Sequence, residues 1–150
     1  MDANSMLMTE RINEVLMMCA RDTPSFERIS NFGVALYVIG CSDAHDIMCM
    51  NDFDICDAVE FLKENFKEIN ESDIPQGYTI NKHNEKYLLV LGDPLFPTHF
   101  AVVVDMDSKK PYFSKLRYFG SGYDNLQELL NEFLDEGLKS SDDAHYFKLA

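Results

Sequence analysis

One stretch of the sequence, residues 87–134, most constrains the fold, because it alternates apolar runs with polar breaks that contain proline. Three strand-like runs lie within it, at residues 87–91, 98–104 and 112–119. Pro94, Pro97 and Pro111 lie in the breaks, where the missing N–H of proline costs no ladder hydrogen bond. Val, Tyr and Phe are frequent in the runs, which favours strands. The stretch therefore predicts antiparallel strands joined by short turns.

The end of this stretch predicts an amphipathic helix. Asp124 is placed to cap the helix, with Gln127 three residues later. Gly137 is placed to end it. The apolar stripe comprises Leu126, Leu129, Leu130, Phe133 and Leu134. We expect Phe133 to be buried between this helix and the sheet.

The residues before this stretch predict two more helices and two more strands. Ser5 to Arg21 and Asp52 to about Asn70 carry apolar residues at helical spacing, and Asn51 or Asp52 can cap the second helix. Gly33 to Gly40 is short, apolar and bounded by glycine, which predicts a strand. Tyr78 to Lys82 predicts another strand. Ile47 to Met50 is ambiguous and is compatible with one further strand.

Together these elements predict the α+β class. We expect an antiparallel sheet, a four-stranded meander plus one or two N-terminal strands, packed against two or three helices. The length of 150 residues, with 46% apolar residues, predicts one acidic domain with a real core. The first four residues predict a frayed end. Residues 138–150 either fray or dock as a short strand at Tyr146 to Leu149.

The formal net charge of −13 limits the classes of partner. It opposes direct binding to nucleic-acid phosphates and to anionic membrane surfaces. It favours solubility, a basic protein partner, or occupation of a site built for DNA or RNA. We find no basic region followed by an apolar run at the N-terminus, so we expect a cytoplasmic protein.

The acidic residues concentrate on the predicted helix from Asp52 onward. Carboxylates along a rigid helix can imitate phosphates and enter a basic groove, although an acidic face can also serve solubility alone. The candidate binding residues are Asp54, Asp57, Glu60, Glu64 and Glu68. They project from a stripe distinct from the apolar face of the same helix, so they can meet a partner without disturbing the core.

Residues 86–134 resemble one known family. The segments KYLLVLGD, FAVVVDMDSKKPYF and YDNLQELLNEFL are similar to the C-terminal half of SUKH-superfamily proteins, in which paired strands and a polar turn precede a helix ending in Phe-Leu. Many members of that family are acidic immunity proteins that neutralise a toxin. The resemblance implies a non-enzymatic binding protein, and it assigns no functional residue.

Two arrangements of cysteine and histidine predict other chemistry. The first is a metal site formed by Cys41, His45, Cys49 and Cys56. All four side chains can bind zinc, but the usual C-x2-C pairs are missing, so we expect no bound metal and no cofactor. The absence of a secretory segment predicts reduced thiols.

The second arrangement is a cysteine hydrolase. Cys56 lies near the start of a predicted helix and His99 on a later strand, an order that resembles papain-like enzymes. Asp105 lies six residues after His99, about 20 Å along a strand, which is too far to orient the imidazole.

The sequence therefore favours a non-enzymatic acidic protein that blocks a basic partner, such as a toxin or a nucleic-acid-binding protein. Immunity proteins and phage-type inhibitors of a host system have this character. The alternatives are a nucleic-acid mimic and a cysteine-dependent hydrolase using Cys56 and His99. The sequence indicates no oligomeric state.

Overall fold

The computed structural model describes residues 3–19, 30–40, 54–116, 120–138 and 140–150. Its helices are α1 (Ala3–Cys19), α2 (Asn31–Ile39), α3 (Ile55–Asn65) and α4 (Leu126–Glu132). Its strands are β1 (Phe66–Ile69), β2 (Tyr87–Asp93), β3 (Phe96–Val103), β4 (Tyr112–Lys115), β5 (Ser121–Asp124) and β6 (Ala144–Leu149).

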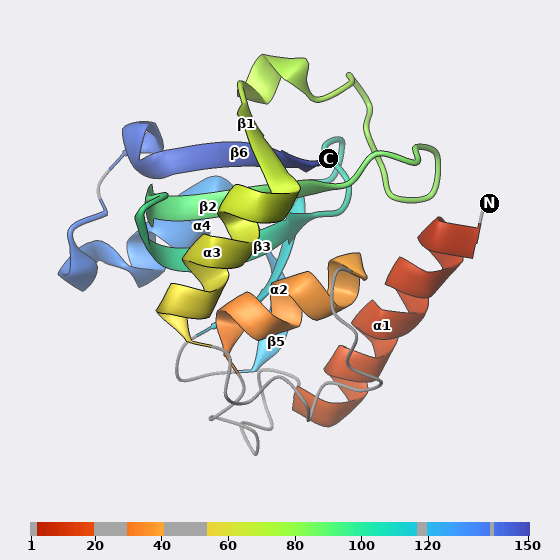
Figure 1. The fold of residues 1–150 in the computed structure, drawn as a ribbon. Coiled ribbons are helices and arrows are strands. Elements are labelled where there is room, and N and C mark those ends of the chain that lie inside the picture. The colour runs from red at the N-terminus through yellow and green to blue at the C-terminus, as the bar shows by residue number, and fades with distance from the viewer. Residues whose placement is uncertain (1–2, 20–29, 41–53, 117–119, 139) are drawn as a thin grey trace.

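The six strands form one sheet in the order β1-β6-β2-β3-β4-β5, and every pairing between neighbours is antiparallel. Strands β2 to β5 follow one another as a meander. Strand β6, from the end of the chain, lies between β1 and β2 (Figure 1). The predicted α+β class, with an antiparallel sheet packed against helices, is confirmed.

Helices cover both faces of the sheet. Helices α2 and α3 lie on the face turned toward the viewer in Figure 1, and α4 lies behind the sheet. Adjacent side chains of β3 point to opposite faces of the sheet. The centre of the His99 ring lies 4.8 Å from that of Phe133, which follows α4. The centre of the Phe100 ring lies 4.8 Å from that of Phe32 in α2. The core therefore has two layers, one on each side of the sheet.

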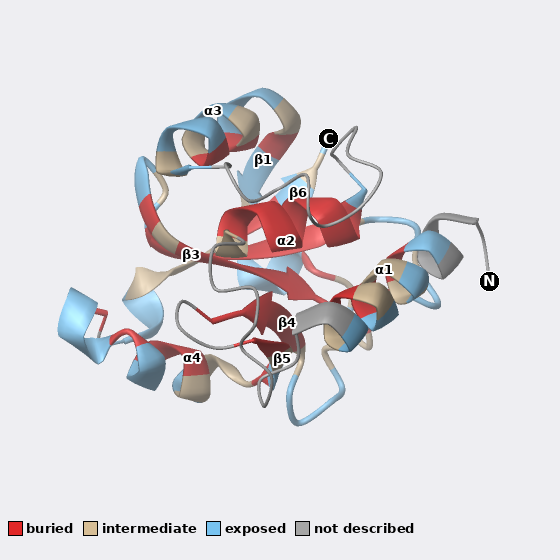
Figure 2. Ribbon diagram, turned by 90° about the horizontal axis from the view of Figure 1, so that it is seen from below, coloured by how far each residue is buried: buried red, intermediate tan, exposed pale blue. Residues whose placement is uncertain are grey.

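Helix α2 replaces the strand that we predicted at residues 33–40, and that prediction is wrong. The Ser30 side chain caps the helix by accepting from the N–H groups of Phe32 and Gly33. Gly40 ends it in the left-handed conformation, with φ of +87°. All residues of α2 after Asn31 are buried, as Figure 2 shows. A helix buried on every side has no polar face, so its sequence resembles a buried strand.

Helix α3 is shorter than predicted. It ends at Asn65, and Phe66 already has extended backbone angles, φ −123° and ψ 156°. Phe66 to Ile69 then form β1, where Phe66 is buried and Ile69 half-buried. The prediction that the helix continues to residue 70 is wrong, because Phe66 to Ile69 pair with β6, although their apolar residues also fit the helical spacing. The predicted cap at residues 51–52 lies outside the described residues.

Two further predictions need correction. Tyr78 to Lys82 is no strand, since it contributes only an isolated bridge between Thr79 and Asp105. Asp124 does not cap α4, because it belongs to β5. The cap is Asn125, whose Oδ1 accepts from the N–H of Glu128, while Glu128 accepts from the N–H of Asn125.

Two predicted strands extend beyond the described residues. They are the ambiguous strand at residues 47–50 and the last part, residues 117–119, of the third strand-like run. The last residues of the chain do dock as a strand, β6. Among the described residues, the helices are all too short or too polar to cross a bilayer.

We expect Phe133→Ala to lower the free energy of unfolding by about 3–5 kcal/mol, the usual effect of truncating a buried aromatic side chain. Phe133 is buried and its ring contacts the ring of His99. Leu134→Ala is the matched control, because Leu134 is exposed and should change stability by less than about 1 kcal/mol. Chemical denaturation measures both, and equal losses in the two variants would contradict this packing.

A second prediction concerns two buried tyrosines on the α4 side of the sheet. The hydroxyls of Tyr112 and Tyr146 are hydrogen-bonded at 2.7 Å. Burial raises the pKa of both phenols above the ordinary value of about 10, and the charge of Glu71 adds to the increase. The pair therefore stabilises the fold fully below about pH 10, and the contribution is lost as pH rises further, because only the unfolded chain ionises there.

We expect unfolding free energy to fall above about pH 10, and to fall less steeply in a Tyr112→Phe, Tyr146→Phe double variant. Replacing both partners leaves neither hydroxyl unsatisfied, so the variant should fold at neutral pH. Denaturant unfolding at several alkaline pH values gives the slope. An unchanged slope in the double variant would show that these phenols titrate normally.

Candidate functional site

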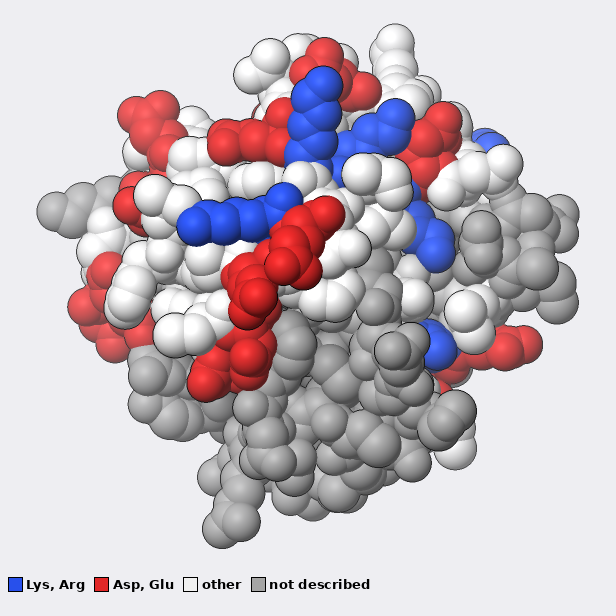
Figure 3. Space-filling view, in the orientation of Figure 1, with Lys and Arg blue, Asp and Glu red and all other residues white. Residues whose placement is uncertain are grey.

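The exposed face of α3 carries a row of carboxylates. Asp57, Glu60 and Glu64 are exposed, while Ala58 and Leu62 on the other side of the helix are buried. The positions follow from helical geometry, because residues three and four apart share a face. Figure 3 shows these acidic atoms as a run along α3, with basic side chains lying beside it. The face predicted from sequence therefore exists on α3.

Two of the five predicted binding residues also hold the start of the helix. Asp54 Oδ1 accepts from the N–H of Asp57 at 2.9 Å, and Asp57 Oδ2 accepts from the N–H of Asp54 at 3.3 Å. This reciprocal capping box satisfies donors that the first turn leaves open. Asp54 and Asp57 thus have a structural role on α3, whereas Glu60 and Glu64 are not part of the cap.

Glu68 does not belong to the helix, which corrects its predicted place. It lies on β1, and its Oε2 is 3.3 Å from Nδ1 of His145 on the neighbouring strand β6. Since α3 leads directly into β1, Glu68 remains close to the acidic face in sequence but is supported by the sheet.

The tip of the β2–β3 hairpin presents two large apolar side chains that the sequence analysis did not single out. Leu95 is 65% exposed and Phe96 is 71% exposed. The tip is tightly built: Asp93 Oδ1 accepts from the N–H of Leu95 at 2.9 Å. Gly92 has φ of +89°, and a Cβ there would lie 2.8 Å from Thr98 Oγ1, so only glycine fits.

A cleft of about 310 Å³ separates this tip from α3. Ile55 and Val59 of α3 line it on one side, and Leu95 and Phe96 line it on the other. Glu60 and Lys63 also belong to its lining. The acidic face of α3 therefore borders an apolar cleft, and the two features form one continuous surface.

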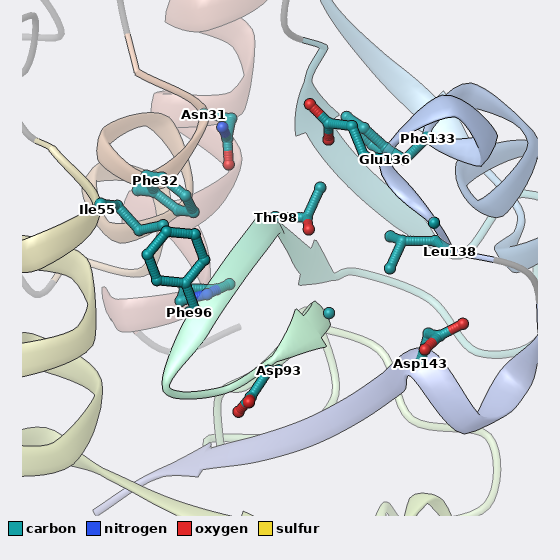
Figure 4. A pocket seen from close by; sticks show the side chains of 13 residues that line it. Asn31, Phe32, Ile55, Asp93, Phe96, Thr98, Phe133, Glu136, Leu138 and Asp143 are labelled. Carbon is teal, nitrogen blue, oxygen red and sulfur yellow. The ribbon is translucent and has the colours of Figure 1, made fainter.

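A second cleft, of about 680 Å³, shares Ile55 and Phe96 with the first cleft. Figure 4 shows Phe96 beside Ile55 and Phe32, with Glu136 and Leu138 across the cleft. Asp93, Glu136 and Asp143 all line this cleft, so its polar lining includes three carboxylates. Phe96 is thus a wall shared by two clefts that both carry acidic side chains.

The structure does not bring Cys56 and His99 together. Cys56 is exposed on α3 and lines the smaller cleft, which His99 does not line. His99 is buried on the opposite side of the sheet, against Phe133. Of the four side chains considered for a metal site, Cys41, His45 and Cys49 lie outside the described residues. Only Cys56 can be placed.

Comparisons with protein-family models, with curated proteins and with solved structures found no match to this chain. The resemblance of residues 86–134 to the SUKH superfamily stays a prediction.

The sequence contained one sign of the hairpin tip. The segment Gly92 to Pro97 places Leu and Phe inside a turn that holds Gly, Asp and two Pro residues. Turns usually lie at the protein surface. Large apolar residues within a turn are therefore expected to stay exposed in the folded chain. That mismatch is the signal in the sequence by which Leu95 and Phe96 could have been found.

The two kinds of acidic residue on α3 predict different effects on stability. Asp54→Ala should lower the unfolding free energy by about 1 kcal/mol, because it removes the cap. Glu60→Lys with Glu64→Lys should change it by less than about 1 kcal/mol, because exposed charges contribute little and the two glutamates repel at four-residue spacing. Thermal or denaturant unfolding compares the variants, and a larger loss in the Glu pair would mean that those residues hold the fold.

Proposed function

We propose that this chain is a non-enzymatic acidic binding protein that blocks a basic partner protein, in the manner of an immunity protein or a phage-type inhibitor. One observation carries the proposal: Asp57, Glu60 and Glu64 project together from a helix whose opposite face is packed on the core. A rigid row of carboxylates can meet a basic groove without rearrangement of the fold.

The chemistry of this face sets the expected binding behaviour. The net charge of −13 attracts a basic partner over distance and orients the encounter through the acidic face. Such steering raises the association rate more than it lowers the dissociation rate. It weakens as salt screens the charges, with a Debye length of about 8 Å at physiological ionic strength.

A nucleic-acid mimic is a special case of the same proposal. The row on α3 supports it, because carboxylates along a helix present regularly spaced negative charge. The partner would then be a nucleic-acid-binding protein, and double-stranded DNA or RNA would compete with this chain for it. Competition by nucleic acid separates the mimic from an inhibitor that binds elsewhere on a basic protein.

The test begins with affinity capture from a lysate of the source organism and identification of the bound protein by mass spectrometry. The captured protein is then purified, and its association rate is measured at increasing salt. We expect Glu60→Lys with Glu64→Lys to lower the association rate at low salt by about tenfold and to flatten its dependence on salt.

The matched control is Glu132→Lys with Asp135→Lys. These exposed carboxylates lie at the end of α4 and in the short 3-10 helix Leu134–Glu136, and their reversal changes the net charge by the same amount. If the control slows association as much as the α3 variant does, net charge and not the α3 face governs binding. If Cys56→Ala abolishes cellular activity while the α3 variant keeps it, the binding proposal fails.

A further inference from the structure

Leu95 and Phe96 stand out among the exposed residues. Six large apolar side chains are exposed in the described parts of the chain, and these two are the only adjacent pair. They lie at a hairpin tip that is fixed by Gly92 and by the Asp93 turn bond. Leu95 is 65% exposed and Phe96 is 71% exposed, so burial in the core does not account for two apolar side chains at this tip. Exposed apolar side chains that lie next to one another in a contiguous patch are typical of interaction sites.

The surroundings of the tip define the chemistry of an occupant. Ile55 and Val59 extend the apolar surface into the cleft against α3. Carboxylates border it on both sides: Glu60 in the smaller cleft, and Asp93, Glu136 and Asp143 in the larger cleft. Lys63 is the only basic residue that lines either cleft among the described residues. An apolar centre with a mostly acidic border is complementary to apolar side chains flanked by Lys or Arg.

The turn bond between Asp93 and Leu95 also favours binding, because it helps to hold the conformation of the tip. A hairpin held in one conformation loses less conformational entropy on binding than a flexible loop does. Less of the interaction energy is therefore offset by that loss. Buried apolar anchors at the centre of an interface usually supply most of the affinity, while charges at the border mainly set the association rate. The tip and the α3 face therefore have separable roles.

We infer that the β2–β3 hairpin tip, Leu95 and Phe96 with Ile55 and Val59, is the apolar anchor of the docking surface. Its occupant is a cationic amphipathic segment of the partner protein, which seats apolar side chains in the cleft against α3 and places Lys or Arg against the bordering carboxylates. This inference rests on the proposed function, because it names the kind of partner segment that the acidic surface takes.

A defined probe tests the inference without knowledge of the partner. The probe is a synthetic peptide of about 18 residues, long enough to form a helix, with Leu on one face and Lys on the other. A second peptide carries Gln in place of each Leu and keeps every Lys. Fluorescence anisotropy measures the affinity of both labelled peptides for the full chain, up to about 1 mM.

We expect the Leu-Lys peptide to bind more tightly than the Gln-Lys peptide. Leu95→Ser with Phe96→Ser should weaken the Leu-Lys peptide by about tenfold and leave the Gln-Lys peptide unchanged. Met17→Ser is the matched control, because Met17 is 87% exposed on α1, and no described residue of α1 lines either cleft. It should change neither affinity. Circular dichroism and thermal unfolding establish that each variant is folded.

The outcomes separate the anchor from the acidic face. If the double Ser variant binds the Leu-Lys peptide as wild type does, or if both peptides bind wild type equally, the anchor is overturned. If the anchor is overturned but Glu60→Lys with Glu64→Lys weakens the binding of both peptides, the proposed acidic face is supported without the apolar anchor. If that charge reversal affects neither peptide while the Ser variant loses the Leu-Lys peptide, the anchor stands and the proposed function fails. Binding of neither peptide overturns both.

Discussion

The pairing of β6 with both β1 and β2 is the interaction on which the rest of the structure depends. Strand β1 has only β6 as a neighbour, and α3 leads directly into β1. The register places Phe66 opposite Leu149, and Ala150 donates its N–H to the carbonyl of Asn65 at 2.9 Å. The end of the chain thus fixes the junction between α3 and β1, and through it the direction in which the acidic face of α3 points.

The β2–β3 hairpin, formed by the two central strands of the same sheet, positions the apolar part of the candidate surface. Strands β2 and β3 pair up to Asp93 and Phe96, so the hairpin is closed to its tip. A register shift between Leu91 and Gly92 bends the hairpin end, where Phe96 lines a cleft with Ile55 of α3. Two segments distant in sequence therefore form one surface, with charge supplied by the helix and apolar contact supplied by the turn.

Elements with clear periodicity can be predicted from the sequence, whereas elements that depend on tertiary contacts cannot. The meander from β2 to β4 and the amphipathic α4 follow from apolar runs, prolines and a stripe. Helix α2 has no polar face, so only its Ser30 cap and Gly40 end distinguish it from a strand. Strand β1 exists because β6 pairs with it, which local spacing cannot show. The carboxylates of α3 were predictable, whereas the cleft needs two remote segments in contact.

The most direct test of the docking surface is amide hydrogen exchange of the protein alone and bound to its captured partner, because exchange reports protection segment by segment. We expect slower exchange on binding in two segments, α3 and the hairpin tip at residues 92–97, with little change in α4. Protection of α4 and β5 with α3 and the tip unchanged would contradict this expectation, and would place the binding surface elsewhere on the molecule.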